Sequence, residues 1–336
     1  DWAASRPFFE QYLAYSQTMY ALAPEDKDAL MELSYAHNTL GSVSMKQQEF
    51  AKAQQDFEES LRLKLLALAK APEDSQLIAD VANARSWLAS AAVSQGDVLS
   101  AIQIHTQLQQ ELSNNIKQPY ILDRLAASHQ ILAKLYDYQD LPEQALRQTR
   151  LGLEAISKAL EQDPKNDIWT RQNYYLHFNL LAFARTDSNE ITRLKSLLDS
   201  DIDLNSSSKR DEVYASYFLA SAQHLQRQGK FDKSIEYAVL AKNEFLKLSK
   251  KFNQNINFIS NLSESILFEA KTVKNYKAKH ELCNTSKYLL LPIVEKDKSP
   301  NFTIHYVKAL DCLGEIISDD NLKHLLLKSH ITNTKF

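Results

Sequence analysis

Histidines are the first residues of this chain that could do chemistry, as ligands of a metal ion. Nine of them are scattered over 336 residues. His37, His129 and His177 share one position of a repeated pattern described below. Equivalent positions in stacked helices lie roughly 10 Å or more apart, whereas zinc–ligand bonds are about 2 Å long. These histidines therefore favour structural contacts between helices, and we expect no metal and no cofactor.

Neighbouring acidic side chains are a second candidate, as an acid–base pair. Glu58 with Glu59 and Asp319 with Asp320 are examples. Adjacent residues of a helix point in different directions and cannot flank one bond, so a solvated surface explains these pairs better. The chain also contains no GxSxG, HExxH or CxxC motif. We therefore expect no catalytic residues and no enzyme activity.

A lysine-rich stretch with interspersed aromatic residues could bind a single-stranded nucleic acid. It extends from Lys247 to Lys279, with Phe252 among its aromatic side chains. Glu264 and Glu269 interrupt the positive charge, and the formal net charge of the whole chain is -3. A chain of this charge has no general attraction to phosphate backbones, so we expect no nucleic-acid partner.

The composition limits the elements that could position these side chains. The chain has 5 Gly and 8 Pro, which is too few for the frequent turns of a large sheet protein. Hydrophobic residues make up 44% of it, enough for a sizeable core. No GxGxxG or phosphate-binding loop motif occurs. A helical fold is therefore favoured over all-β and large α/β folds.

The compartment is left open by the sequence. Cys283 and Cys312 are too few for a disulfide framework or a zinc site. There is no run of 18 apolar residues that could span a membrane. We expect a soluble domain, either cytoplasmic or periplasmic.

An internal repeat organises the chain. Residues 33–41, 81–89 and 125–133 align without gaps, and each segment ends in Leu followed by a small residue. Seven residues later come the turn residues Gln48, Gly96 and Asp140, each preceded by Gln, and five residues further the small residues Ala53, Ala101 and Ala145. Ala222, Gly229 and Ser234 repeat the pattern, Gly314 follows another Leu, and weaker copies centre near Leu181 and Leu267. The period of about 46 residues is typical of a helical repeat array.

The pattern resembles that of tetratricopeptide repeats, whose units are helical hairpins. The matching residues are Leu40, Gly41, Phe50, Ala53, Phe57 and Ser60, then Leu88, Ala89, Gly96, Asp97 and Ala101, then Leu132, Tyr136, Ala145, Gly152 and Pro164, and later Gly229, Phe231, Ala238 and Ala241. The usual unit has about 34 residues. The longer units here resemble those in regulatory regions of large bacterial signalling proteins. The resemblance implies an all-α fold, a right-handed α-solenoid of helical hairpins.

The boundaries of the units follow from the alignment and from prolines such as Pro24, Pro72 and Pro164. We expect one superhelical domain over residues 1–336, with repeats near 28–72, 75–118, 120–164, 168–205, 211–253 and 257–298 and terminal helices over 302–332. Residues 201–209 are polar and loop-like, which makes 200–210 the best candidate for a bend. Residues 1–24 fit the second helix of a repeat whose first helix is missing. We therefore expect the chain to be a fragment.

The resemblance also implies a binding surface, because the first helices of tetratricopeptide hairpins line a concave groove that binds peptides. The residues expected to face it are Tyr35, Asn38, Ser42, Asn83, Ser86, Ser90, Gln130, Lys134, Ser216, Gln223 and Arg227. The family's carboxylate-binding groove pairs Asn with Lys and Arg. Asn38 and Asn83 have no such neighbour in the matching positions, so a clamp of that type is not expected.

These observations predict a non-catalytic scaffold or sensor module that binds a protein or peptide. We expect it to be part of a larger bacterial regulatory or signalling protein. The alternative is a structural or oligomerisation module that assembles through its terminal helices. A groove used only for packing within the protein also stays open.

Overall fold

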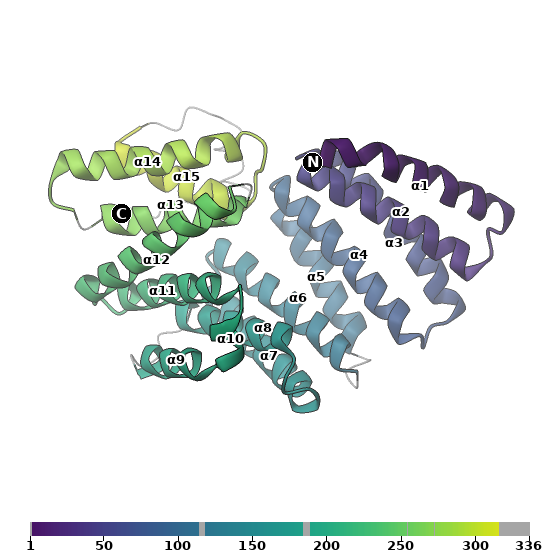
Figure 1. Ribbon diagram of the computed structural model, residues 1–336, viewed down its shortest axis with the longest axis horizontal. Coiled ribbons are helices and arrows are strands. Elements are labelled where there is room, and N and C mark those ends of the chain that lie inside the picture. The colour runs from purple at the N-terminus through teal and green to yellow at the C-terminus, as the bar shows by residue number, and fades with distance from the viewer. Residues whose placement is uncertain (1, 114–117, 184–188, 254, 272, 316–336) are drawn as a thin grey trace. The chain divides into compact units, whose positions relative to one another are not determined.

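The protein is built from α-helices in the computed structural model, which describes residues 2–113, 118–183, 189–253, 255–271 and 273–315 (Figure 1). Those residues form fifteen helices and no strand. The helices are α1 (Trp2–Leu22), α2 (Lys27–Lys46), α3 (Phe50–Lys70), α4 (Ser75–Ser94), α5 (Val98–Ser113), α6 (Pro119–Tyr138), α7 (Pro142–Gln162), α8 (Asp167–Phe183), α9 (Asn189–Ser200), α10 (Ile202–Ser206), α11 (Arg210–Arg227), α12 (Phe231–Lys251), α13 (Ile256–Ala270), α14 (Tyr276–Val294) and α15 (Pro300–Leu313). The predicted all-α class is confirmed.

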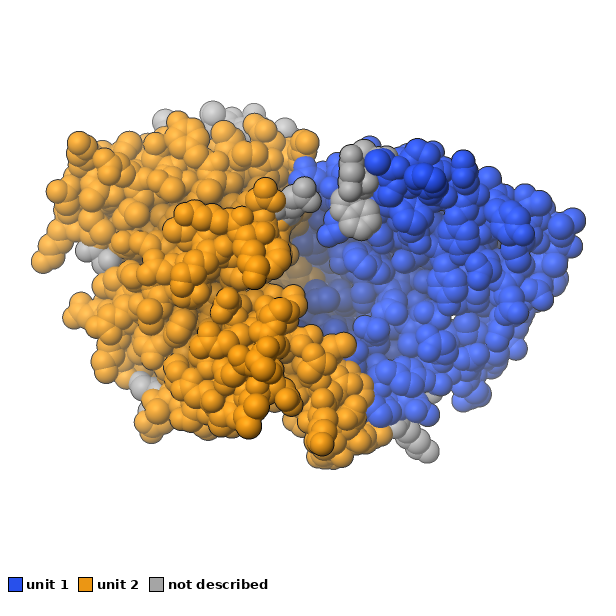
Figure 2. Space-filling view, viewed as in Figure 1, with its two compact units in different colours: residues 1–132 blue, residues 133–336 orange. Residues whose placement is uncertain are grey.

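The chain divides into two compact units, Asp1–Leu132 and Ala133–Phe336 (Figure 2). Helices α1 to α5 and most of α6 belong to the first unit, and the helices from α7 onward belong to the second. The candidate bend at 200–210 lies inside the second unit. The single domain expected over residues 1–336 stays a prediction.

Within each unit, helices pack mainly against their neighbours in sequence. The pairs α2–α3, α3–α4, α11–α12 and α12–α13 are in extensive contact. Four of the repeat ranges expected from the sequence hold such a pair: α2–α3, α4–α5, α11–α12 and α13–α14. In the range 168–205, α8 packs against α7 and α11 and touches α9 only slightly. The terminal range 302–332 holds the greater part of α15, and its remainder lies outside the described residues. The described chain is thus built mainly of helical hairpins, and within each compact unit a hairpin buries its apolar face against the next.

Four hairpins close with the same turn. The residue after the repeated Gln adopts a left-handed backbone, with φ of 61° at Gln48, 84° at Gly96, 55° at Asp140 and 74° at Gly229. The amide that follows each turn residue donates to the carbonyl five residues earlier, as from Glu49 to Ser44 at 2.9 Å and from Lys230 to Leu225 at 2.9 Å. This bond satisfies a carbonyl that the helix end would otherwise leave unpaired. The turn positions predicted by the alignment are confirmed.

Small residues of the second helices face the first helices, as the alignment predicts. Ala53, Ala101 and Ala145 are all completely buried, and Ser234 is nearly so. The Ser234 hydroxyl donates to the carbonyl of Ala222 at 2.8 Å, which joins α12 to α11. A larger side chain at these positions would push the two helices of a hairpin apart.

Side chains of Asp and Asn begin several helices. The Asp26 carboxylate accepts a hydrogen bond from the amide of Ala29 at 2.9 Å. Asp74, 48 residues later, accepts from Gln76 and Leu77 at 3.0 and 3.2 Å. Such caps satisfy amides that have no partner within the helix. Each Asp follows the Pro-Glu pair expected to separate the repeats, so the boundaries before α2 and α4 are explained locally.

The caps also correct the register of one later repeat. Gly41 lies fifteen residues after the cap Asp26, and Gly314 lies fifteen residues after the cap Ser299. The same count from the cap Asn255 reaches Ala270, which is buried, so the repeat of α13 centres there and not on Leu267. Gly314 itself has φ of 70° and ends α15 instead of lying within the helix.

Residues 201–209, expected to form a polar loop, contain the short helix α10. Asp201 caps it by accepting from the amide of Leu204 at 2.8 Å. The Leu204 side chain is buried in a cluster that includes Leu194 and Leu198 of α9. The Tyr174 hydroxyl of α8 also donates to Asp201, at 2.7 Å. One apolar residue and one capping carboxylate thus order a segment whose composition is otherwise that of a loop.

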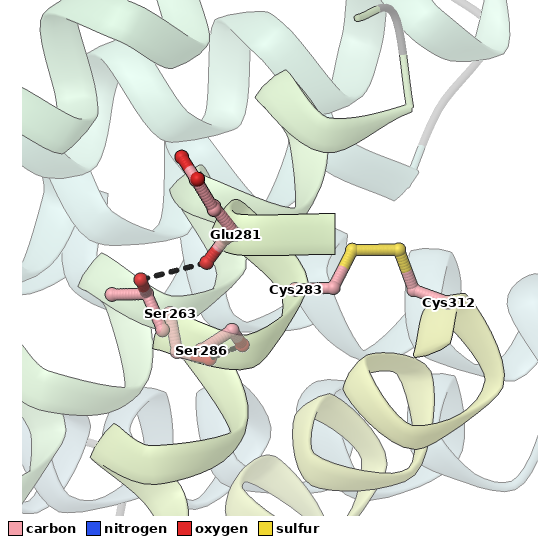
Figure 3. Close-up of a disulfide and its surroundings, with 6 residues drawn as sticks. Ser263, Glu281, Cys283, Ser286 and Cys312 are labelled. Atoms are coloured by element: carbon pink, nitrogen blue, oxygen red, sulfur yellow. Dashed lines mark hydrogen bonds between the residues drawn. A yellow bond between two sulfur atoms is a disulfide. The ribbon is translucent and has the colours of Figure 1, made fainter. Parts of the chain in front are cut away.

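A disulfide joins the last two described helices. Cys283 of α14 and Cys312 of α15 are bonded, with their Cα atoms 6.0 Å apart (Figure 3). Cys283 is fully buried beside Leu267, Ala270 and Ala309. The cysteine count gave no reason to pair them, because a separation of 29 residues in sequence does not show that two helices lie side by side.

Candidate functional site

The face of the first helices that carries the predicted groove residues is called the groove face here. It includes residues of α2, α4 and the first part of α6 in the first unit, and of the end of α6 and α11 in the second. All of the predicted residues are partly or well exposed, and none is buried: Tyr35, Asn38, Ser42, Asn83, Ser86, Ser90, Gln130, Lys134, Ser216, Gln223 and Arg227. Their side chains are therefore accessible, and their role in binding stays a prediction.

In the first unit, Tyr35 joins two successive first helices. Its hydroxyl lies 3.3 Å from Oδ2 of Asp80, which links α2 to α4. Burial, reinforced by the Asp80 carboxylate, raises the pKa of Tyr35 to about 12. The phenol therefore stays protonated and remains a hydrogen-bond donor at neutral pH.

Asn38 presents an unused acceptor on the same face. Its Oδ1 atom is buried from solvent and has no hydrogen-bond partner among the described residues. A buried acceptor of this kind costs about 1–3 kcal/mol when it is left unpaired. Because the atom is shielded from solvent, a peptide N–H reaches it only after the Asn38 side chain rotates outward.

The serines of the groove face already use their hydroxyl protons within their own helices. Ser42 donates to the carbonyl of Asn38 at 2.9 Å and Ser90 to that of Ser86 at 2.8 Å. Ser86 and Ser216 make the same bond to the carbonyls four residues earlier. Such bonds are common for Ser within helices. These side chains can still accept a hydrogen bond, but they offer no free donor to a ligand.

The second unit carries a charged network on its groove face. The Gln223 amide of α11 donates to Oε1 of Glu264 of α13 at 2.9 Å. The other Glu264 oxygen lies 3.5 Å from Nε2 of His305 of α15. His305 is itself buried, with Nδ1 3.3 Å from the Ser260 hydroxyl. Burial lowers the pKa of His305, and the Glu264 charge opposes that shift only in part.

Arg227 extends the network to the end of α6. Its guanidinium atom Nη2 lies 3.4 Å from Oδ1 of Asp137. The guanidinium carbon, Cζ, lies 6.0 Å from the centre of the Phe183 ring. Burial raises the pKa of Asp137, and the Arg227 charge partly counteracts this. Lys308 of α15 also contributes to the electrostatic field at Asp137 and Glu264. The network thus crosses four helices, α6, α11, α13 and α15.

Glu264, His305 and Lys308 are the residues that sequence reasoning missed. Tyr35 and Asn83 each lie nine residues after the cap of their helix, Asp26 or Asp74. Glu264 lies nine residues after the cap Asn255, and Lys308 nine residues after the cap Ser299. The capping residues therefore hold the signal that would have placed both side chains on the groove face.

The repeated position of His37 makes contacts between helices. His37 Nδ1 lies 3.0 Å from Asp56 of α3, and Arg85 donates two hydrogen bonds to Glu111 of α5, at 2.9 and 2.7 Å. At the same position, His129 contacts Gln109 of α5 at 2.8 Å, and His177 lies 3.9 Å from Glu190 of α9. These distances agree with the structural role predicted for this position.

In the part of the chain that the structure describes, no three or more His, Cys, Asp or Glu side chains are grouped so that they could hold a metal ion. Its helices also include none that combines the length and apolar character needed to cross a membrane. The chemistry of the groove face is therefore hydrogen bonding and charge pairing by amide, hydroxyl, carboxylate, ammonium and guanidinium groups.

Comparison with known proteins yields similarity of fold. No protein-family model and no curated protein matches the sequence. A signal-transduction ATPase with numerous domains and a tetratricopeptide repeat sensor, from Pyrococcus horikoshii, is 16% identical with a TM-score of 0.45. The match covers 98% of this chain and 47% of that one, so this chain spans about half the length of that protein.

Two further solved structures are similar. BtubC from P. vanneervenii is 12% identical with a TM-score of 0.42, and 100% of this chain and 95% of that one are covered. A tetratricopeptide repeat protein from Parabacteroides merdae is 16% identical with a TM-score of 0.37, and 90% and 98% are covered. At these identities the likeness concerns the arrangement of helices alone.

Proposed function

We propose that the groove face binds an extended segment of a partner protein and that the chain is a non-catalytic scaffold or sensor module. The observation that carries this proposal is the network on the second unit. The predicted groove residues Gln223 and Arg227 lie in one polar cluster with Glu264, His305 and Asp137. The ion pair in this cluster, Arg227 with Asp137, is partly exposed, and such a pair stabilises a fold little, so its presence on an accessible face favours a role in recognition.

The chemistry of the face suits a peptide backbone and its side chains. The Gln223 amide can be shared with a peptide carbonyl, and the hydroxyl oxygens of the groove-face serines can accept a peptide N–H. Charged groups of the second unit can pair with charges on the partner. Repeat arrays provide extended surfaces of this kind. The long repeats further support a place within a larger bacterial regulatory or signalling protein, as the sequence resemblance suggests.

A phage-displayed library of random peptides tests this function. Peptides selected on the protein are labelled, and their affinity is measured by fluorescence anisotropy. For a peptide bound to the second unit, Glu264→Gln and Arg227→Ala each weaken binding about 10-fold, as expected for a loss of about 1.4 kcal/mol. For a peptide bound to the first unit, the double variant Asn38→Ala, Asn83→Ala has this effect and leaves the melting temperature nearly unchanged.

A matched control lies on a second helix. Lys52 of α3 is exposed and is not part of the groove face, so Lys52→Ala leaves every affinity unchanged. If the selected peptides bind every groove-face variant as tightly as they bind the original protein, this face is not the binding site.

A second function, self-assembly, is favoured by a separate observation on α1. Phe8, Tyr15, Met19 and Leu22 form an exposed apolar stripe, with 71%, 69%, 37% and 84% of their surfaces accessible. In the next repeat, 48 residues later, Leu63 and Ala67 replace Tyr15 and Met19 and are completely buried. A second copy of the chain would cover this stripe through its own α1.

Light scattering over a range of concentrations distinguishes this function from the first. Self-assembly predicts a mass that rises with concentration, and Tyr15→Glu, which places a charge in the stripe, returns the protein to a monomer. A strict monomer at high concentration argues against assembly through α1. The C-terminal end of the proposed assembly surface, residues 316–332, lies outside the described residues.

A further inference from the structure

The ring of His305 is held between two polar side chains of α13. Its Nδ1 atom lies 3.3 Å from the Ser260 hydroxyl, and its Nε2 atom lies 3.5 Å from Oε2 of Glu264. The Ser260 hydroxyl donates its one proton to the carbonyl of Asn301 at 2.9 Å, so towards the ring it acts as an acceptor. The hydrogen bonds therefore place the proton of the neutral ring on Nδ1.

The neutral ring sets two acceptors opposite each other. With the proton on Nδ1, Nε2 of His305 presents a lone pair to Oε2 of Glu264, and a carboxylate oxygen is also an acceptor. These two atoms are called the acceptor pair here. The other Glu264 oxygen, Oε1, already accepts from the Gln223 amide at 2.9 Å. The acceptor pair therefore suits a group that donates: a proton on the ring, or the N–H groups of a ligand.

The acceptor pair is open to solvent on the groove face. Neither atom makes a hydrogen bond with the described residues, so both would belong to the buried unpaired atoms if they were shielded, as Asn38 Oδ1 is; they do not. Glu264 lies nine residues after its helix cap, as the predicted groove residues Tyr35 and Asn83 do. The side chains of Glu264 and His305 are 15% and 10% exposed. A narrow group such as the end of a lysine or arginine side chain fits such an opening.

Nearby lysines keep the His305 ring uncharged at neutral pH. Burial lowers the pKa of His305, Lys308 and Lys271 lower it further, and the Glu264 charge opposes them. The ring therefore takes up a proton only as the pH falls below the ordinary value of about 6.5. Glu264 stays ionised, because the positive groups around it lower its pKa despite its burial. Lys308 makes no ion pair with the described residues, so its ammonium does not occupy the acceptor pair.

Other charged groups near the acceptor pair change little in mild acid, with one exception. Arg227 of α11 pairs with Asp137 of α6. On the side of α14, Lys287 pairs with Glu315. Burial lowers the pKa of Lys271 to about 8, so this lysine is already protonated. Asp137 is the exception, because burial raises its pKa, and it needs a control of its own.

We infer that Glu264 and His305 form a proton-gated site for a lysine or arginine side chain of the partner protein. The inference rests on the proposed function of this face. At neutral pH the partner's cationic group donates to Oε2 of Glu264 and to Nε2 of His305. In mild acid a proton from solvent binds Nε2, and the imidazolium pairs with the carboxylate. The partner's cation then loses one acceptor and is repelled by the new charge.

The proton and the partner's cation exclude each other, and the effect is reciprocal. A bound cation weakens proton binding by the same factor by which the proton weakens binding of the cation. For full exclusion, the affinity one pH unit below the midpoint of the His305 titration is about 10-fold weaker than one pH unit above it. The midpoint thus defines the two pH values at which binding is compared.

NMR of the intact chain, with nitrogen-15 in its histidine rings, tests the proton site without any ligand. The His305 signals are those missing from His305→Gln. We expect the neutral ring to carry its proton on Nδ1, Glu264→Gln to lower the pH at which the ring titrates, and Lys308→Met to raise it. A neutral ring protonated on Nε2, one midpoint in all these proteins, or a ring that does not titrate before the protein unfolds would overturn the inference.

A library-selected peptide whose affinity depends on Glu264 tests the gate. Its sequence is expected to contain Lys or Arg, and replacing that residue by Gln should weaken binding about 10-fold. The affinity for the original protein, measured by anisotropy, should fall about 10-fold from one pH unit above the midpoint to one below it. His305→Gln should bind nearly equally at both values. Equal affinity for the original protein, or an unchanged fall in His305→Gln, would overturn the gate.

Two control variants are expected to keep the fall in affinity. His177→Gln removes another histidine of the second unit whose pKa burial lowers, one that contacts Glu190 of α9. Asp137→Asn removes the other group that gains a proton in mild acid. Whatever their affinity at neutral pH, both should show the fall seen with the original protein. Loss of the fall in Asp137→Asn would assign the pH dependence to Asp137 and overturn the role of His305.

Failure of the gate and failure of the proposed function give different results. Peptides that depend on Glu264 but bind equally on both sides of the midpoint overturn the gate and leave the proposed function in place. If no selected peptide depends on Glu264, the proposed function of this face fails and the cation site fails with it, even where the NMR titration shows the expected proton site.

Discussion

A Cβ atom added to Gly41 would come within 2.6 Å of Cε1 of Phe57, so helix α2 passes the ring of α3 at a distance that only glycine permits. Ala is normally about 1 kcal/mol better than Gly within a helix. Here the clash should reverse that preference, and Gly41→Ala is expected to lower the free energy of unfolding by about 1–3 kcal/mol. Urea denaturation measures the change.

A double-mutant cycle with Phe57→Leu separates the clash from other effects. A Leu side chain leaves room beside residue 41, so the double variant should be more stable than the sum of the two single changes predicts, by at least about 0.5 kcal/mol. Simple additivity of the two losses would show that the ring is not the cause.

The shared turns give a second prediction: replacing a turn residue by Gly should stabilise the protein, and replacing a turn Gly by Ala should destabilise it. Gln48 and Asp140 occupy left-handed backbone with φ of 61° and 55°. Residues with a Cβ atom adopt this conformation at a cost of about 1–2 kcal/mol. Gln48→Gly and Asp140→Gly are therefore expected to raise stability by up to about 1 kcal/mol, measured by thermal or urea unfolding.

The reverse changes provide the control for these turns. Gly229 has φ of 74° and no neighbour within 4 Å of an added Cβ, so Gly229→Ala tests the backbone alone. It should lower stability by about 1 kcal/mol. A stabilising Gly229→Ala would contradict the role assigned to the turn.

His105 gives the protein a sensitivity to acid. Its ring is buried, with Nδ1 3.1 Å from the Ser128 hydroxyl of α6, and burial lowers its pKa to about 4. The pKa in an unfolded chain is about 6.5. Because the folded value is the lower one, the stability it contributes is complete above about pH 6.5 and is lost as the pH falls toward 4.

The size of this effect follows from the two pKa values. Protonation of His105 alone lowers the free energy of unfolding by about 2.5 kcal/mol between neutral pH and pH 4.5. Urea denaturation at pH 7 and pH 4.5 should show His105→Gln losing less stability on acidification than the original protein. Equal losses in both proteins would place the sensitivity in other groups.

Reduction of the disulfide gives a fourth prediction, on stability. Cross-linking residues 29 positions apart restricts the unfolded chain, and the loss on reduction is expected to be about 3.6 kcal/mol. Denaturation with and without a phosphine reductant measures it. Cys312→Ala should show one and the same curve under both conditions, and a reductant effect in this variant would point to another cause.

Local signals in the sequence predicted much of the fold. The positions of Gln48, Gly96, Asp140 and Gly229 mark turns because left-handed backbone and its hydrogen bonds depend on nearby residues only. Ala53 and Ala101 are buried for a similarly local reason, the close approach of two helices in one hairpin.

The groove face was predicted less completely, because its contacts join residues far apart in sequence. Glu264 was not assigned to it, since the repeat of α13 was aligned on Leu267 and not on Ala270, a shift of about one helical turn. The partners Arg227 and Asp137 lie 90 residues apart. Neither their pairing nor that of Cys283 with Cys312 follows from periodicity, which describes one element at a time.

The repeated turns also have a consequence for synthesis of the chain. Their hydrogen bonds join residues at most five apart, so a hairpin can close without waiting for distant segments. A ribosome adding about 5–20 residues per second releases a unit of about 46 residues every few seconds. Helical structure rich in local contacts forms in microseconds to milliseconds. Each hairpin turn should therefore form before the next one emerges, and the hairpin becomes stable when its neighbour covers its open apolar side.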